Sequence, residues 1–390
     1  MKITIKSLSK IVLAAVLSVS AFTFTANAQH SEAHVDTTVH TEAVATTVEH
    51  TETHAAEAHG EAHGVKEKFS AGKLITEHII DAYGWHLWGH TSIPLPVILY
   101  SSANGLEVFS SNAFGHAPHY EKVPGKNGVT YTIVHNKVVA IDASGAPDEA
   151  FNKGVYDFSI TKNVASMWFS ILLLLIIFFS VASSYKKNKG KAPSGMQSLI
   201  EPIILFLRDD VAKPAIGHKH EKFMPFLLTV FFFILINNLM GLVPIAPGGA
   251  NLTGNITVTA VLACFTFIYV TLSGNANYWA HIFFMPGVPK PVLLILTPIE
   301  ILGVFLRPFV LMIRLFANIT AGHIIALSFF SLIFIFGEMS QGAGYGVGIF
   351  SVAFTIFMSG LEVLVAFIQA YVFTLLSAMY LGAAVEEAHH

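Results

Sequence analysis

Five long apolar tracts dominate the C-terminal part of the sequence. The first, residues 164–183, supplies about twenty uncharged and mostly apolar residues, enough to cross the hydrocarbon core of a bilayer as a helix. Of the whole chain, 53% is hydrophobic and only 12% is charged, a balance that excludes an ordinary soluble domain. We therefore predict an all-α polytopic membrane protein with about five transmembrane helices. The other four tracts are residues 223–243, 256–272, 291–337 and 347–385.

The last two tracts are each too long for one perpendicular crossing, since a helix rises ~1.5 Å per residue. Either each tract contains two spans or each is a long tilted helix, and the apolar pattern leaves both possibilities open. Both tracts also carry ionisable residues, which the rest of the membrane region, residues 161–390, largely lacks.

Residues 194–213 predict an amphipathic helix that lies on the cytoplasmic membrane interface. Gln197, Glu201, Asp209 and Asp210 fall on its polar face. The apolar face, at helical spacing, comprises Met196, Leu199, Ile200, Ile203, Ile204, Leu207 and Val211.

The N-terminal region has three parts. Residues 1–28 have the pattern of a secretory signal peptide, with basic residues, a short apolar stretch and the small-x-small site Ala26-Asn27-Ala28; a retained anchor is the alternative. Residues 29–64 are rich in His, Glu, Thr and Ala and predict a disordered tether. Their histidines are also suited to metal binding or pH sensing. They are His30, His34, His40, His50, His54, His59 and His63.

Residues 65–160 predict a small extracytoplasmic domain with some β structure. Residues 129–134 and 137–141 alternate in polarity around His135-Asn136, which indicates a hairpin. The outside location follows from the positive-inside rule, because four lysines directly follow the first apolar tract and mark its cytoplasmic end. They are Lys186, Lys187, Lys189 and Lys191. Because the five predicted spans begin outside, the C-terminus lies in the cytoplasm.

Three charged residues form one stripe in the fourth tract. Glu300, Arg307 and Arg314 are seven residues apart, so on a helix they drift by only about 20° per step, and Asn318 extends the stripe by a turn. A charge in hydrocarbon costs at least ~2.5–3.5 kcal/mol, so each should face a partner, the protein interior or water. For Arg307, near the cytoplasmic end of the tract, a structural role in which the side chain snorkels to the interface is at least as good an explanation as a functional role. For Arg314 the alternative to a functional role is an internal salt bridge.

The fifth tract places Glu362 and Gln369 on one helical face, again seven residues apart. His323 follows Arg314 by nine residues, ~13 Å along a helix, too far for direct contact with the guanidinium. His323 and Glu362 are candidates to pair across two packed helices, either as a proton relay or as a static hydrogen bond.

The motif Arg314-Leu-Phe-Ala-Asn318-Ile-Thr-Ala-Gly322-His323 resembles the signature of the a subunit of F-type ATP synthases. The run Asn237-Asn-Leu-Met-Gly-Leu-Val-Pro244 and the run Gln369-Ala-Tyr-Val-Phe-Thr-Leu-Leu agree with it, and the resemblance covers residues 164–390. It implies a bacterial inner-membrane subunit that conducts H⁺ without a cofactor or bound metal. It also implies a long tilted helical hairpin against a ring of c subunits, with b subunits and the F1 sector as further partners.

The resemblance also implies roles for single residues. Arg314 corresponds to the essential arginine that couples proton flow to rotation. The outer half-channel is lined by Asn318, His323, Glu362 and Gln369, and Glu300 lies toward the cytoplasmic exit.

Two features depart from the family pattern. Many bacterial members carry Glu and His where this chain has His323 and Glu362, so the pair is kept but exchanged. An acidic residue often found near the position of Thr253 is missing. The resemblance also says nothing about residues 29–160.

Other classes of function fit the sequence less well. A divalent metal-ion transporter would explain the His-rich tract, but Arg314 on the ion path would raise an electrostatic barrier to a dication. No Gly-rich loop ending in Gly-Lys-Ser/Thr is present, so ATP chemistry must lie on other subunits. The net charge of -3 gives no basic face for a nucleic acid.

Overall fold

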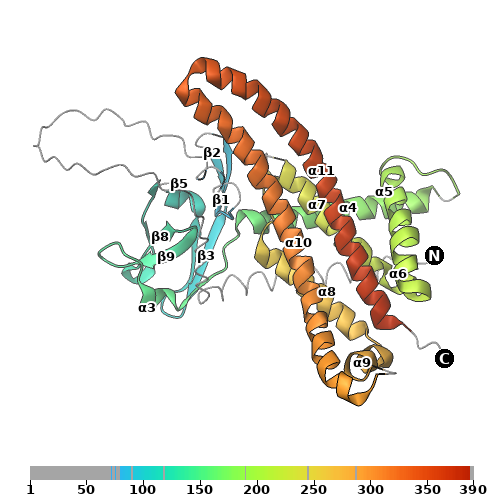
Figure 1. The fold of residues 1–390 in the computed structure, drawn as a ribbon. Helices are drawn as coiled ribbons and strands as arrows, with labels where there is room; N and C mark the ends of the chain where they lie inside the picture. The colour runs from blue at the N-terminus through green and yellow to red at the C-terminus, as the bar shows by residue number, and fades with distance from the viewer. Residues whose placement is uncertain are drawn as a thin grey trace, which may run out of the picture.

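The computed structural model describes residues 72, 75, 80–88, 91–116, 119–188, 190–243, 246–285 and 288–386. The predicted signal peptide, residues 1–28, and the predicted tether, residues 29–64, lie outside the described residues. Figure 1 shows a body of long helices with a small β-rich domain at one side.

Five stretches of helix are long and apolar enough to cross a membrane, which confirms the predicted polytopic class. They include the helices α4 (Lys162–Lys187), α7 (His220–Leu242), α8 (Ile256–Ser273), α10 (Lys290–Met339) and α11 (Gln341–Val385). Each of the last two tracts is therefore one helix rather than two spans. At 50 residues α10 is about 75 Å long, more than twice the ~30 Å hydrocarbon core, so it must either tilt strongly within the membrane or extend beyond it.

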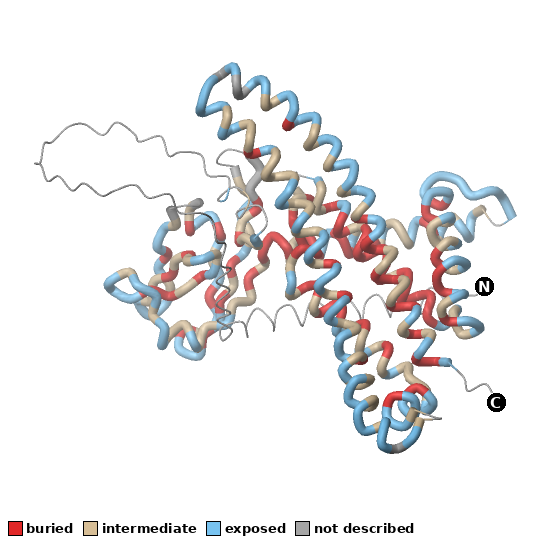
Figure 2. Tube along the Cα trace, viewed as in Figure 1, coloured by how far each residue is buried: buried red, intermediate tan, exposed pale blue. Residues whose placement is uncertain are grey.

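The bundle is organised around α7, which is buried along most of its length. It packs against α8 through the stacked rings of Phe226 and Tyr269, whose centroids are 4.3 Å apart. It packs against α11 through an edge-to-face contact of Phe231 with Phe367. In contrast, much of α10 and α11 is exposed (Figure 2). The hairpin therefore presents a long uncovered face to whatever surrounds it.

The segment predicted as the amphipathic helix is divided in the structure. It comprises α5 (Met196–Phe206), the π-helical turn η3 (Leu207–Ala212) and α6 (Lys213–Ile216). At its start Gln197 is buried against the bundle, whereas Met196 and Leu199 are exposed, so these apolar side chains remain free to meet lipid. The Gln197 amide donates to the Glu201 carboxylate at 3.2 Å, and both side chains lie against Tyr185 of α4.

The short helices α9 (Ala276–Phe283) and η4 (Gly217–Lys219) lie at the end of the bundle where α11 finishes. Asn275, which precedes α9, donates its backbone N–H to the Ala384 carbonyl at 2.9 Å. Its side chain donates to the Val385 carbonyl at 3.0 Å, so the last carbonyls of α11 are satisfied.

The β-rich domain is built from short antiparallel strands in four small sheets. The strands β8 (Thr130–Val134) and β9 (Lys137–Ile141) pair in the register Val134↔Lys137, so the turn consists of His135 and Asn136, both at positive φ. The central sheet has the order β10-β3-β4, from Val155–Asp157, Pro96–Ser101 and Gly105–Ser110. The remaining strands are β1 (Gly84–Trp88), β2 (Thr91–Pro94), β5 (Gly115–His116), β6 (His119–Tyr120) and β7 (Val123–Pro124).

The helical turns of this domain are η1 (Ser111–Phe114), η2 (Lys126–Gly128) and α3 (Glu149–Asn152). Its core contains Leu99, Phe114 and Tyr131, all nearly inaccessible. The Tyr131 hydroxyl donates to the buried Glu107 carboxylate at 2.7 Å, which satisfies both polar groups inside the core.

Hydrogen bonds connect this domain to one end of the helical bundle. Trp85, only 7% exposed, donates its indole N–H to the Gly248 carbonyl in the α7–α8 connection at 3.0 Å. The backbone N–H of Lys162, the first residue of α4, donates to the Ala82 carbonyl at 2.8 Å. The domain therefore lies at the end of the bundle where α4 begins and the α7–α8 connection turns.

Candidate functional site

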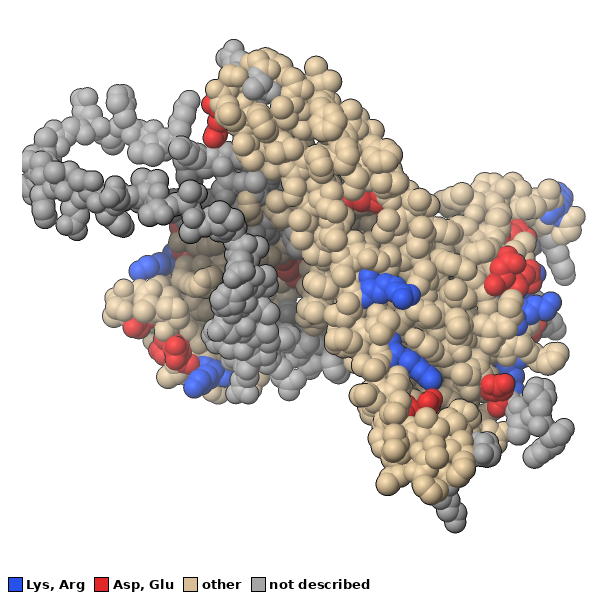
Figure 3. All heavy atoms as spheres, viewed as in Figure 1, with Lys and Arg blue, Asp and Glu red and all other residues tan. Residues whose placement is uncertain are grey.

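Arg314 lies on the uncovered face of α10. Its helical neighbours Leu311 and Leu315 are buried toward the bundle, while Arg314 and Asn318 are exposed. Within the part of the chain that the structure describes, Arg314 forms no ion pair. Figure 3 shows that few charged side chains appear on the surface over the hairpin. A guanidinium in this position needs a counter-charge from outside the subunit or from water.

Arg307, one stripe position away, has a different environment. Its guanidinium lies 3.7 Å from the Glu300 carboxylate and 5.4 Å from the centre of the Tyr380 ring on α11. An ion pair and a cation–π contact thus both act on Arg307. The stripe therefore contains one paired arginine and one arginine without an ion-pair partner among the described residues.

His323 and Glu362 lie further along the hairpin than Arg314, toward the turn between α10 and α11. A Cβ built on Gly322 would lie 3.2 Å from Glu362 Oε1, so the absence of a side chain at Gly322 lets α10 and α11 approach closely here. A Cβ built on Gly241 of α7 would lie 3.8 Å from His323 Nε2. His323 therefore faces α7 and the α7–α8 connection, whereas Glu362 faces α10.

No direct hydrogen bond joins His323 to Glu362 among the described residues. Glu362 Oε1 is buried and lacks a hydrogen-bond partner within that part of the chain. An uncompensated buried carboxyl oxygen costs about 1–3 kcal/mol, more when the group is charged. The site around Glu362 therefore favours a water molecule that donates a hydrogen bond to this oxygen.

The hairpin contacts also place Gln369 level with Arg314. Gly322 lies opposite Glu362, and Arg307 lies opposite Tyr380. Antiparallel helices advance equally per residue, so Arg314, midway along α10 between those contacts, is level with the part of α11 around residue 371. Gln369 is 6% exposed there, on the interior side of the hairpin.

Asn238 of α7 was not singled out by sequence reasoning. Its Oδ1 accepts a hydrogen bond from the Thr253 hydroxyl at 2.6 Å, and its Nδ2 donates to the Ala366 carbonyl at 3.2 Å. It therefore connects the α7–α8 connection to α11 between Glu362 and Gln369. The available signal was the pair Asn237-Asn238 in an otherwise apolar tract, because polar side chains inside a membrane need partners.

Within the residues that the structure describes, no group of three or more His, Cys, Asp and Glu side chains is arranged to hold a metal ion. The predicted His-rich tract lies outside those residues. The metal-transport alternative therefore gains no support from the site.

Comparisons with known proteins match both the helical part and the β-rich part of this chain. Residues 164–382 match the family model described as "ATP synthase A chain", and residues 74–158 match a model described only as a domain of unknown function. The chain is 48% identical over 244 residues to "ATP synthase subunit a" of Chloroherpeton thalassium, covering 61% of this chain and 70% of that protein.

Two further relatives align over more of the chain. "ATP synthase subunit a 2" of Prosthecochloris aestuarii is 40% identical over 315 residues, which cover 76% of this chain and 92% of that protein. "ATP synthase subunit a" of Chlorobium phaeobacteroides is 37% identical over 357 residues, covering 90% of this chain and 85% of that protein. These matches do not favour a metal transporter. The chain therefore belongs to the family of F-type ATP synthase a subunits.

Proposed function

We propose that Arg314 is the charge that couples proton flow to rotor movement, and that this subunit provides two offset half-channels on either side of it. The subunit is a proton-translocating, multi-pass component of the F0 sector rather than a catalytic subunit. The observation that carries the proposal is an exposed guanidinium on an apolar helix face, without an ion-pair partner in the described residues.

The physical role of Arg314 follows from its charge. A fixed cation favours the ionised form of a carboxyl group that passes it, by opposite-charge stabilisation. A carboxylate on a moving c ring would therefore release its proton before Arg314 and take up another one after it. The same cation raises a barrier to protons moving directly between the two aqueous paths. Protons can then cross only with rotation of the ring.

The outer half-channel is proposed to contain His323, Glu362, Asn318 and Gln369. The packing of Glu362 against Gly322 and the place of Gln369 level with Arg314 support a path that leads along the hairpin toward the arginine. The inner half-channel is proposed on the other side of Arg314, near Glu300. Arg307 acts there in a secondary role, since it is paired with Glu300 and Tyr380.

The partners follow from the uncovered hairpin face. We propose that a c-subunit ring covers α10 and α11, that b subunits hold the subunit in the stator, and that the F1 sector is contacted indirectly. The lysines at the end of α4 support a bacterial inner-membrane orientation with the β-rich domain, residues 65–160, outside and the C-terminus in the cytoplasm.

The test is ATP-driven proton pumping in membrane vesicles that contain the whole complex. Arg314→Ala should abolish pumping while the complex still assembles. Arg208→Ala is the matched control, because Arg208 is an arginine in an exposed pair with Asp209, and such pairs contribute little. It should leave pumping near the wild-type rate. Preserved coupled pumping in Arg314→Ala would refute the proposal, and zinc uptake by the purified chain would favour metal transport.

A further inference from the structure

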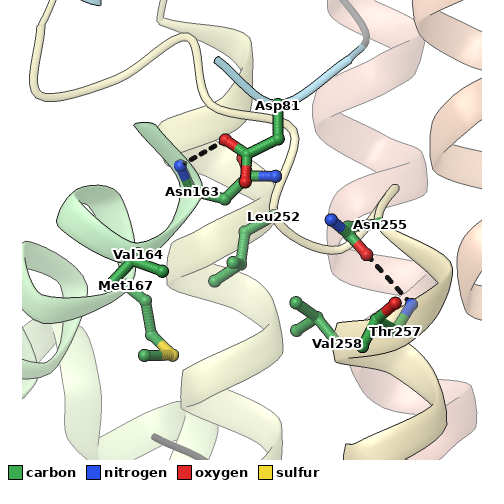
Figure 4. A pocket seen from close by; sticks show the side chains of 8 residues that line it. All are labelled: Asp81, Asn163, Val164, Met167, Leu252, Asn255, Thr257 and Val258. Atoms are coloured by element: carbon green, nitrogen blue, oxygen red, sulfur yellow. Dashed lines mark hydrogen bonds between the residues drawn. The ribbon is translucent and has the colours of Figure 1, made fainter. Parts of the chain in front are cut away.

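A small cavity lies where the β-rich domain meets the helical bundle. Its volume is about 30 Å³, enough for one or two water molecules. Figure 4 shows its lining: Asp81, Asn163, Val164, Met167, Leu252, Asn255, Thr257 and Val258. The lining thus combines the segment before β1, the start of α4, the α7–α8 connection and the start of α8.

Asp81 and Asn163 supply the polar atoms at one side of this cavity. Asp81 Oδ1 accepts hydrogen bonds from the backbone N–H groups of Ala82 and Asn163, both at 3.0 Å. The Asn163 side chain is 4% exposed, and its Oδ1 has no hydrogen-bond partner among the described residues. A buried acceptor of this kind at a water-sized cavity is suited to bind a water molecule next to the Asp81 carboxylate.

One charged side chain near the cavity lies close to both Asp81 and the site around His323. Lys162 is 8% exposed, and its ammonium donates to the Ile80 carbonyl at 3.4 Å. It lies within electrostatic range of both Asp81 and His323. The Tyr83 hydroxyl, which donates to the Asp157 carboxylate, also lies within electrostatic range of Asp81. The α7–α8 connection and α8 contribute no charged residue, because residues 243–273 contain none.

We propose that Asp81 is a proton relay at the outer mouth of the proton path, passing protons through water in this cavity toward His323. In each step the carboxylate takes a proton from outside water and returns it to cavity water, so Asp81 is regenerated. This proposal rests on the proposed function of the subunit. It gives the β-rich domain a role in transport, since that domain supplies the carboxyl group.

The alternative role of Asp81 is structural, because its carboxylate also satisfies an N–H at the start of α4. Asp81→Asn separates the two roles: the amide oxygen still accepts those hydrogen bonds, whereas the amide cannot carry a proton at neutral pH. Asp142→Asn is the matched control, since Asp142 is an exposed turn residue of the same domain that does not line the cavity.

The assay is ATP synthesis by the whole complex in inverted vesicles whose lumen is acidified to a series of pH values. We expect the rate for Asp81→Asn to fall about tenfold, below the ~10²–10⁴ typical of a positioned acid–base group because water replaces it in part. The deficit should be largest at the least acidic luminal pH, where protons are scarcest. Val258→Leu, which fills the cavity and leaves the Asp81 hydrogen bonds intact, should produce the same pattern.

Wild-type rates at every pH in both cavity variants would overturn the relay, as would an equal deficit in Asp142→Asn. If Asp81→Asn does not assemble, Val258→Leu alone decides between the outcomes. Failure of the proposed function is distinguishable, because it would appear as retained coupling in Arg314→Ala whatever the cavity variants do.

Discussion

Gly382→Ala tests whether the end of α11 is held against α6 as closely as the structure shows. A Cβ on Gly382 would lie 1.9 Å from the Ala215 carbonyl oxygen and 2.9 Å from the Ala215 carbonyl carbon. Both atoms belong to the backbone, so no side-chain rotation can relieve the clash. The two segments would have to separate by more than 1 Å.

The expected cost follows from two opposing effects. Overpacking costs ~1–3 kcal/mol, and a clash with backbone belongs at the upper end of that range. Replacing Gly by Ala within a helix recovers about 1 kcal/mol. The net loss in the free energy of unfolding is therefore about 2 kcal/mol, which corresponds to a fall in midpoint temperature of about 4–8 °C for a unit of about 150–250 residues, such as the membrane region, residues 161–390.

The measurement is the heat resistance of the assembled complex, followed by the fraction of this subunit that stays bound to it after stepwise heating. Gly346→Ala is the control on the same helix, because a Cβ there would meet nothing within 4 Å. It should match or slightly exceed the wild-type midpoint. Equal midpoints for Gly382→Ala and Gly346→Ala would refute the close approach of α11 to α6.

Three further predictions concern the ends of the helices and the charged groups. Asn255→Ala should lower the unfolding free energy by about 1 kcal/mol in the same heating assay, because the Asn255 side chain caps α8 by accepting a backbone N–H at 2.9 Å. Asn255→Asp should retain this cap and match the wild type. Tyr380→Leu should reduce but not abolish proton pumping, because Arg307 keeps its ion pair with Glu300; complete loss would contradict the secondary role of Arg307. Burial raises the pKa of the Asp81 carboxyl in the folded protein. Ionisation of Asp81 therefore lowers the free energy of unfolding at pH values above that raised pKa. This destabilisation vanishes below the unfolded pKa of about 4. Asp81→Asn should therefore resist heat better than wild type at pH 7.5, with a difference that narrows as the pH falls; a constant difference would contradict this reasoning.

The helical tracts could be predicted because the bilayer sets simple limits. A crossing needs a sufficient length of uncharged residues, and that can be counted along the chain. Seven-residue spacing likewise places Glu300, Arg307 and Arg314 on one stripe wherever a helix forms. The motif around Arg314 then indicated the family that the comparisons support.

Contacts between segments that are distant in the sequence could not be predicted from residue spacing. At the start of α5 the apolar periodicity did not indicate that Gln197 would be buried, because its burial depends on Tyr185 of a neighbouring helix. The length of residues 291–337 left one helix or two open, and only the continuous backbone of α10 decided between them.

The sequence by itself determined the membrane class, the positions of the apolar segments and the stripe of charges, because these depend on local periodicity and on the cost of charge in hydrocarbon. Only the tertiary structure decided which arginine is paired: Arg307 meets Tyr380, 73 residues away, and Arg314 meets no counter-charge within the described residues. It also brought Asp81 to the start of α4. Such pairings depend on how separate helices pack, and spacing along one chain segment carries no information about the neighbour it will face.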